Sequence, residues 1–330
     1  MKKVLLWLGI VLATTGVKAQ IMLPEQQRML RIYEDNDLFN ISGQGTDEAY
    51  TNGTRIDYFY FRKKPARSFD KWVLPQTGRN SINRYYWSVM QIMITPTDLA
   101  TTQYQPNDYS YAGALYGAHG LLSYNPDKKY NLHSEWLLGV MGPWAFAKEA
   151  QTLMHRVIDA QRPMGWGNQL PNDLLINYSL RAEKMLWQPA SWIDILGGAA
   201  VYTGTMINSA TINATIRAGY FRPYFGQPTG TTPEKRAWPE IYAYIRPSAE
   251  GVFHNALLEG SIFSHHYNKM LMESEYNTTR QRRWSTTLEF GTAVSFRGVA
   301  VTYTQRSNSA ELKGAPRHEV GNISLYVALP

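Results

Sequence analysis

The sequence predicts an all-β fold, a closed antiparallel barrel of about twelve strands that crosses a membrane. Long segments alternate apolar and polar residues with the two-residue period of a strand. Aromatic residues gather at the ends of these segments, where the girdles of a membrane barrel lie. Residues 20–330 contain no run of 18 consecutive apolar residues, so we expect no transmembrane helix. A soluble β-sandwich would alternate as well, but segment length and aromatic placement favour the barrel.

The first 19 residues have the pattern of an export signal. Two lysines precede an apolar run from Val4 to Val17, and small residues at Val17 and Ala19 fit a signal-peptidase site. We therefore expect residues 1–19 to be a signal peptide. Residues 20–330 should form one domain, because no repeat or low-complexity segment divides them. The sequence has no cysteine, which excludes disulfides and thiolate chemistry.

The net charge limits the partners of the protein. The formal charge is +7, and loss of the signal segment with its three lysines lowers it to +4. A weakly basic protein is compatible with an anionic lipid headgroup as partner. Because lysine and arginine do not cluster into runs, we expect no nucleic-acid binding. The sequence does not decide the oligomeric state.

The alternation is clearest in the segments 176–183, 208–220, 284–296 and 322–329. In 208–220, for example, alanine, isoleucine and tyrosine occupy one face, and serine, threonine, asparagine, arginine and glycine the other. Applied along the whole chain, the same criterion gives an even number of strands, as in bacterial barrels. The predicted strands are 28–37, 51–62, 84–95, 110–120, 130–141, 172–187, 191–203, 207–221, 238–259, 282–296, 298–306 and 319–329.

Turn residues separate several of these strands. Tight turns are predicted at Asn125-Pro126-Asp127, Gln188-Pro189-Ala190 and Phe296-Arg297-Gly298. Longer loops are predicted between the remaining strands, and their unequal lengths suggest one rim with short turns and one with long loops. The longer loops are 38–50, 63–83, 96–109, 142–171, 222–237 and 262–281.

One segment, at about residues 144–161, reads as a helix inserted into the β pattern. Gln151 and His155 are four positions apart and therefore share one helix face. Ala147, Val157 and Ile158 are predicted to pack on the barrel. A lone histidine on a helix is more commonly a packed or surface residue than a catalyst. The amides on its face, together with a polar cluster at a strand end, make His155 the candidate base.

That polar cluster ends the first predicted strand with the sequence Glu34-Asp35-Asn36-Asp37. Calcium takes several oxygen ligands from carboxylates, amides and backbone carbonyls, so this stretch is a candidate cation site. If the first two strands form a hairpin, a second polar stretch at 46–53 meets the first at the same rim. On composition alone an acidic turn is the commoner explanation, since Asp and Asn favour turns.

Other catalytic templates are absent from the sequence. It contains no Gly-x-Ser-x-Gly nucleophile motif, no His-Glu-x-x-His zinc helix and no glycine-rich phosphate loop.

Several spaced motifs, taken in order, resemble those of the LpxR-type lipid A deacylases of Gram-negative outer membranes. The resemblance runs over most of the chain after the signal segment, and its longest motif surrounds His155. The matching residues are Asp35 to Phe39, Thr46-Asp47 with Tyr50 to Gly53, Asp108 with Tyr111 to Gly113, Gly139 to Pro143, Glu149, Gln151, His155, Gly165-Trp166, Asn168-Gln169, Arg306 and Glu311.

This resemblance implies a twelve-stranded outer-membrane barrel that removes the 3′-linked acyloxyacyl group of lipid A with the help of calcium. By position, His155 would be the general base, with Gln151 beside it. Asn36 and Asp37 would bind or orient the calcium ion, and Thr51 would line the site. The sequence departs from the family pattern at two positions, where Thr101 and Gln161 stand in place of a lysine and a glutamate.

Two alternatives stay open. An outer-membrane phospholipase is also a calcium-using barrel of twelve strands by family resemblance, but it needs a serine nucleophile beside a histidine on a strand. A non-enzymatic narrow barrel or porin would have no reason to bring His155 and Asp37 within reach of one cation.

Overall fold

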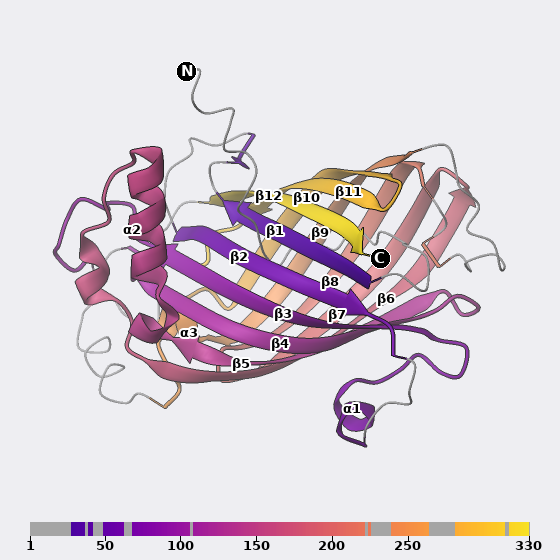
Figure 1. Ribbon diagram of the computed structural model, residues 1–330, viewed down its shortest axis with the longest axis horizontal. Coiled ribbons are helices and arrows are strands. Elements are labelled where there is room, and N and C mark those ends of the chain that lie inside the picture. The colour runs from indigo at the N-terminus through magenta and orange to yellow at the C-terminus, as the bar shows by residue number, and fades with distance from the viewer. Residues whose placement is uncertain are drawn as a thin grey trace.

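Twelve antiparallel strands close into a barrel in the computed structural model, with β1 paired to both β2 and β12 (Figure 1). The structure describes residues 28–36, 39–41, 49–62, 68–105, 108–221, 224–225, 239–263, 281–313 and 317–329. Residues 1–19, the predicted signal peptide, lie outside this set. Every strand pairs with its neighbours in sequence, so the predicted fold class is confirmed.

The observed strands follow the predicted ones closely, and most ends differ by two residues or fewer. β4 extends five residues past its predicted end at 120, and the last four residues of the predicted strand 238–259 form a short helix instead. The strands are β1 (Arg28–Asn36), β2 (Ala49–Tyr60), β3 (Ile82–Thr95), β4 (Ala112–Asn125), β5 (Tyr130–Met141), β6 (Asp173–Ala190), β7 (Ile193–Gly204), β8 (Ile207–Tyr220), β9 (Glu240–Asn255), β10 (Trp284–Phe296), β11 (Val299–Asn308) and β12 (His318–Leu329).

The predicted turn at Gln188-Pro189-Ala190 is wrong, because β6 continues through all three residues and the chain turns at Ser191-Trp192. Pairing with β7 becomes irregular between Trp187 and Ala190. Proline has no N–H to donate, and such an irregularity is where a strand tolerates it. The turn at Arg297-Gly298 is confirmed. Both residues have positive φ, 48° and 86°, as a two-residue hairpin turn of type I′ requires.

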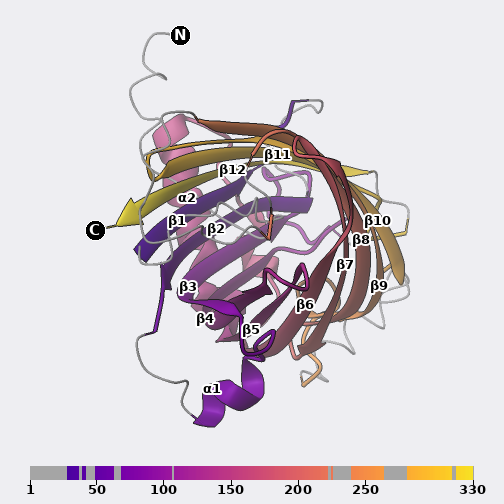
Figure 2. The same cartoon turned by 90° about the vertical axis from the view of Figure 1, so that its right-hand side faces the viewer.

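The two rims of the barrel carry different connections (Figure 2). The rim that we call the α2 rim carries the connections 96–111, 142–172 and 309–317. The opposite rim, here the terminal rim, holds the start of β1, the end of β12 and the short turn between β10 and β11. It also holds the long connections 61–81 and 221–239. Long loops are therefore not confined to one rim, in contrast to the prediction.

The outer face of the barrel is apolar and the inner face is polar. Exposed apolar side chains cover the outside of most strands, which is the surface that a membrane barrel presents to lipid. They include Val89, Leu138, Ile176, Ile212, Ile245 and Val301. Ion pairs fill much of the inside, among them Arg31–Asp57 and Arg217–Asp194. In the part of the chain that the structure describes, no helix is long and apolar enough to cross a bilayer.

The predicted helix at about 144–161 is shorter than expected and is divided. A 3₁₀ turn, η2 (Gly142–Ala145), precedes α2 (Ala147–Ile158), and Phe146 between them has φ 54°. A second 3₁₀ turn follows, η3 (Gly165–Asn168). Two further short helices were not predicted, α1 (Ser68–Val73) and α3 (Ala256–Glu259). Both are too short for a periodic pattern to show in the sequence.

Candidate active site

The candidate site begins with a row of residues that crosses the outer face of the barrel at the α2 rim. Asn36 of β1 pairs with Asn52 of β2, Asn52 with Met93 of β3, and Met93 with Gly113 of β4. Adjacent strands are about 4.8 Å apart, so Asn36 and Gly113 are separated by roughly 14 Å along the wall. Because directly paired residues point to the same side of a sheet, all four belong to one face.

The N-terminal end of α2 packs on the Gly113 end of this row. A Cβ atom placed on Gly113 would lie 2.5 Å from Cβ of Ala147, so only glycine permits this approach. Gln91 of β3 holds the preceding turn by donating to the main-chain oxygen of Ala145 at 2.7 Å. Figure 1 shows α2 lying crosswise to β2–β5. His155 is about 12 Å along the helix from Ala147, in the direction of β1.

The face that α2 turns toward the wall is polar beyond Ala147. Its buried residues are Ala147, Gln151 and His155, which recur at the four-residue spacing of one helix face. The apolar residues point away from the barrel: Val157 is 67% exposed and Ile158 49% exposed, together with Leu153 and Met154. The prediction that Val157 and Ile158 pack on the barrel is therefore wrong. The buried polar side chains of α2 need hydrogen-bond partners. The exposed apolar side chains of the other face suit apolar surroundings.

Two hydrogen bonds fix the polar side chains of α2. The indole N–H of Trp166 donates to Oε1 of Gln151 at 2.7 Å, and the ring of Trp166 is fully buried against Tyr111. The Nδ1 atom of His155 lies 2.5 Å from the main-chain oxygen of Gln161. A carbonyl oxygen can only accept, so Nδ1 carries the proton and Nε2 carries the lone pair. The Nε2 atom of Gln151 is buried and has no hydrogen-bond partner among the described residues.

The connection between β3 and β4 supports this arrangement from the side. Main-chain bonds join Met164 to Leu99 and Leu170 to Tyr111, and the side-chain amide of Asn168 donates to the main-chain oxygen of Thr102. Thr101 lies in the same connection, and its hydroxyl accepts from the main-chain N–H of Gln103. The structure thus places Thr101 beside η3, where its short side chain is already engaged.

Around Asn36 the outer face is unusually polar. Glu34 shares the parity of Asn36 and therefore also points outward, yet its side chain is only 3% exposed. The amide of Asn52 donates to Oε1 of Glu34 and to the main-chain oxygen of Asp35. The other carboxylate oxygen, Oε2, is buried without a hydrogen-bond partner in the described chain. Asp35 points into the barrel instead, where Arg306 lies 3.5 Å away.

A short stretch of chain, residues 39–41, flanks Asn36 on the side opposite to α2. The main-chain oxygen of Phe39 covers Gly321, the partner of Asn36 on β12, and accepts from the hydroxyl of Tyr303 at 2.7 Å. The main-chain N–H of Ile41 donates to Oε1 of Gln305 at 3.1 Å. Asn36 therefore lies between this stretch and α2 on the outside of the barrel.

The structure brings some of the predicted site residues together and leaves others undescribed. Gln151 and His155 share the buried face of α2, and Asn36 lies at the other end of the row to which that helix is anchored. Asp37 lies outside the described residues. Thr51 belongs to β2, but its side chain is not described. Glu149 and Asp159 are exposed. The described residues contain no group of three or more His, Asp or Glu side chains arranged to hold a metal ion.

Glu34 belongs to the predicted polar cluster, but its outward orientation and its contact with Asn52 were not predicted. The strand alternation contains the signal that was missed, because Glu34 and Asn36 are two positions apart and must share a face. A buried carboxylate oxygen without a partner is costly unless a proton or a cation satisfies it. The Glu34 carboxylate and the Asn36 amide carry oxygen donors of the kind that calcium accepts, so these two residues suit a calcium ion in their chemistry.

Comparison with known proteins places the chain in a family. The family model described as "Outer membrane protein LpxR" matches residues 4–329. LpxR from Salmonella typhimurium has a structure with a TM-score of 0.70 and 14% sequence identity, covering 91% of this chain and 100% of that chain. At this identity the likeness shows the fold alone.

Two other solved structures are less similar. An outer membrane channel from Pseudomonas putida F1 gives a TM-score of 0.48 at 9% identity over 96% of this chain and 100% of its own. The β domain of the Bordetella autotransporter Brka gives 0.43 at 8% identity over 92% and 98%. No curated protein sequence matches the chain. Because the family model covers nearly the whole chain, the protein belongs to the LpxR family of outer membrane proteins.

Proposed function

We propose that this protein hydrolyses the 3′-linked acyloxyacyl ester of lipid A in the outer membrane, with His155 as the general base. The observation that carries the proposal is the orientation of His155 on the buried, wall-facing side of α2. Its Nδ1–H is held by the main-chain oxygen of Gln161, so Nε2 has the lone pair that a base requires. Membership of the LpxR family supports the choice of lipid A as substrate.

The position of the site supports a lipid substrate. His155, Gln151 and the row from Asn36 to Gly113 lie on the outer face of the barrel, and exposed Leu153, Met154, Val157 and Ile158 surround them on α2. A substrate with several acyl chains can reach such a site from the bilayer without entering the lumen. A small polar solute of a porin would have no access to it from inside.

In the proposed reaction His155 takes a proton from a water molecule, which attacks the ester carbonyl. The bond between the carbonyl carbon and the sugar oxygen then breaks, and the protonated His155 returns the proton to that leaving oxygen, so that the acid and a sugar hydroxyl are released. Gln151, held by Trp166, keeps its Nε2–H group on the same face as His155, where it can donate to the substrate. Asn36 and Glu34 would hold a calcium ion, with Asp37 as a further ligand by family resemblance. When bound, that ion supplies positive charge to stabilise the developing oxyanion.

The test is mass spectrometry of lipid A from cells that express the wild-type protein or His155→Ala. We expect the wild type to remove one acyloxyacyl unit, and the variant to be slower by a factor on the order of 10²–10⁴. Arg156→Ala changes the exposed neighbour on α2 and serves as the matched control. Heat-dependent gel mobility verifies that each barrel is folded. Activity of His155→Ala at the wild-type level would refute the base assignment, and unchanged lipid A with new lysophospholipid would favour the phospholipase.

A further inference from the structure

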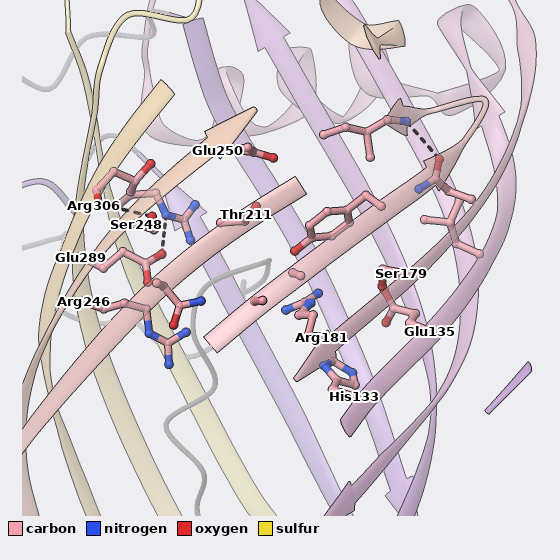
Figure 3. Close-up of a pocket in the computed structure, with 18 of the residues that line it drawn as sticks. His133, Glu135, Ser179, Arg181, Thr211, Arg246, Ser248, Glu250, Glu289 and Arg306 are labelled. Carbon is pink, nitrogen blue, oxygen red and sulfur yellow. Dashed lines mark hydrogen bonds and ion pairs between the residues drawn. The ribbon is translucent and has the colours of Figure 1, made fainter. Parts of the chain in front are cut away.

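A second polar site lies inside the barrel, apart from the outer face. The lumen contains a cavity of about 430 Å³ whose walls come from most of the strands (Figure 3). Volumes of this size hold small-molecule ligands in other proteins. Its lining includes Arg181 of β6, Arg246 of β9 and Arg306 of β11, together with several glutamates.

Arg181 differs from the other two arginines because it forms no close ion pair in the part of the chain that the structure describes. Arg246 pairs with Glu183 at 3.0 Å, and Arg306 pairs with Glu289 at 2.9 Å. None of the ion pairs or hydrogen bonds within the described ranges includes Arg181, and its Nε atom is buried without a partner. Its guanidinium carbon lies 5.6 Å from the ring centroid of Tyr202. Figure 3 shows its guanidinium group projecting into the cavity near His133.

The carboxylate that interacts electrostatically with Arg181 is Glu135, and it is shared with other groups. Glu135 pairs with Arg55 and accepts from the hydroxyl of Tyr86. The N–H group at Nε of Arg181 is therefore left without an acceptor in the described part of the chain, and an oxyanion in the cavity would supply one.

Both ends of the lumen are narrowed around this region. Toward the α2 rim, Leu257 of α3 joins an apolar cluster with inward-facing residues of β3 and β4, including Ile92 and Tyr116. Toward the terminal rim, the hydroxyl of Tyr224 donates to Glu183 at 2.5 Å and its ring is buried. A solute held between these two narrow regions is shielded from bulk water. Electrostatic attraction is stronger there than in solvent.

We propose that the lumen holds a small oxyanion, a carboxylate or phosphate group, bound by Arg181. The planar fork of a guanidinium group matches two oxygens of such an anion. The hydroxyl of Tyr202 and the inward-facing Ser179, its partner across the β6–β7 pair, lie on the same wall and line the same cavity. The site is separate from His155, which is on the other face of the barrel, and does not depend on the proposed hydrolysis.

The experiment supplies a carboxylate for Arg181 from the protein itself. Ala200 of β7 is the direct cross-strand partner of Arg181, is buried and lines the cavity. Directly paired side chains lie about 5 Å apart at Cβ, so Ala200→Asp places a carboxylate within reach of Arg181. Ala200→Asn adds a side chain of the same size without the charge and is the matched control. Arg181→Gln removes the guanidinium group.

Binding of inorganic phosphate and of acetate to the purified full-length protein is measured by calorimetry at pH 7. We expect wild type and Ala200→Asn to bind at least one of the two anions at a single site. Ala200→Asp and Arg181→Gln should bind that anion with an affinity lower by about tenfold or more. Binding of phosphate alone would identify a phosphate site, and binding of acetate alone would identify a carboxylate site. Heat-dependent gel mobility and lipid A deacylation, both expected at wild-type levels, verify that each variant is folded.

Two results would overturn the proposal. The first is wild-type protein that binds neither anion at concentrations up to about 10 mM, which would mean that water alone solvates Arg181. The second is a folded Arg181→Gln or Ala200→Asp variant that binds as tightly as wild type, which would place the anion elsewhere. Loss of deacylation in His155→Ala leaves this experiment unaffected, so the two proposals fail independently.

Discussion

The Nδ1 atom of His155 is bound to the main-chain oxygen of Gln161, at the point where α2 has ended and the chain has turned back. A second group that orients a catalytic imidazole is commonly a carboxylate or a backbone carbonyl. Here the backbone supplies it. The departure of the sequence from the family pattern at Gln161 therefore leaves the tautomer of His155 intact.

Replacement of the Gln161 side chain should consequently have little effect. Gln161 is exposed, and its amide donates to the main-chain oxygen of Arg162. We expect Gln161→Ala to retain lipid A deacylation within about tenfold, since one hydrogen bond contributes about 0.5–1.5 kcal/mol. A loss of 100-fold or more in kcat would show that the side chain takes part in the reaction.

The turn that presents this carbonyl should be more sensitive than the side chain. Asp159 closes α2 with φ 56°, a region that β-branched residues avoid. We expect Asp159→Val to displace the Gln161 oxygen and lower kcat by about tenfold or more, and Asp159→Gly to retain activity. Assays of purified variants in mixed lipid A–detergent micelles measure both. Equal activity of the two variants would contradict the assigned role of the turn.

Contact between Gly113 and Ala147 sets the position of α2. Gly113→Ala would bring two Cβ atoms to 2.5 Å and push the helix from the wall. Because small displacements of catalytic groups are costly, deacylation should fall by about 100-fold while the barrel stays folded. Gly117→Ala is the control on the same strand and face, since its Cβ would meet nothing closer than 3.8 Å. If both variants were fully active, α2 would not need this contact.

The buried oxygen of Glu34 should matter for calcium. Glu34→Gln keeps the shape and the contact to Asn52 but removes the charge, so calcium affinity should fall by about tenfold or more. Calorimetric titration of calcium into the purified protein measures this without an activity assay. Asp127→Asn removes an exposed carboxylate at the opposite rim and should not change the affinity. Equal affinities of wild type and Glu34→Gln would exclude Glu34 as a ligand.

Glu311 should make stability depend on pH. Burial, together with the nearby carboxylate of Glu250, raises the pKa of Glu311 from 4.5 to about 7. The folded state therefore holds the proton more tightly than the unfolded state. Its stabilising contribution is complete below pH 4.5 and is lost as the pH rises toward about 7.

Glu311→Gln removes this titration. We expect the variant to melt at a higher temperature than wild type at pH 8, with a much smaller difference at pH 4.5. Thermal unfolding in detergent at both pH values measures the effect. Glu149→Gln, which changes an exposed carboxylate of α2, is the control. A difference between wild type and Glu311→Gln that does not change with pH would contradict the raised pKa.

Strand alternation predicted the barrel well because each face has one environment along its whole length. The turn signal at Pro189 was wrong, because β6 continues through this proline at an irregularity in its pairing with β7. The sequence pattern also could not separate α2 from η2, since the residue between them, Phe146, adopts a left-handed conformation that its residue type rarely takes.

The shared helix face of Gln151 and His155 followed from their spacing, which is a local property. The orientation of α2 was wrong at Val157 and Ile158, because a soluble protein buries apolar residues and a membrane protein exposes them. Partners such as Trp166 and the Gln161 carbonyl depend on the fold of the loop, which the sequence pattern does not encode.

The pairing of β1 with β12 has a consequence for biogenesis. Residues about 290 positions apart meet at this seam, where Asn36 lies opposite Gly321 and the stretch 39–41 rests on β12 and β11. Until β12 has paired with β1, the part of the site around Asn36 lacks the neighbouring strand and the stretch 39–41 that border it. We therefore expect the proposed activity to require the closed barrel, because an open chain lacks the β1–β12 pairing that completes this side of the site.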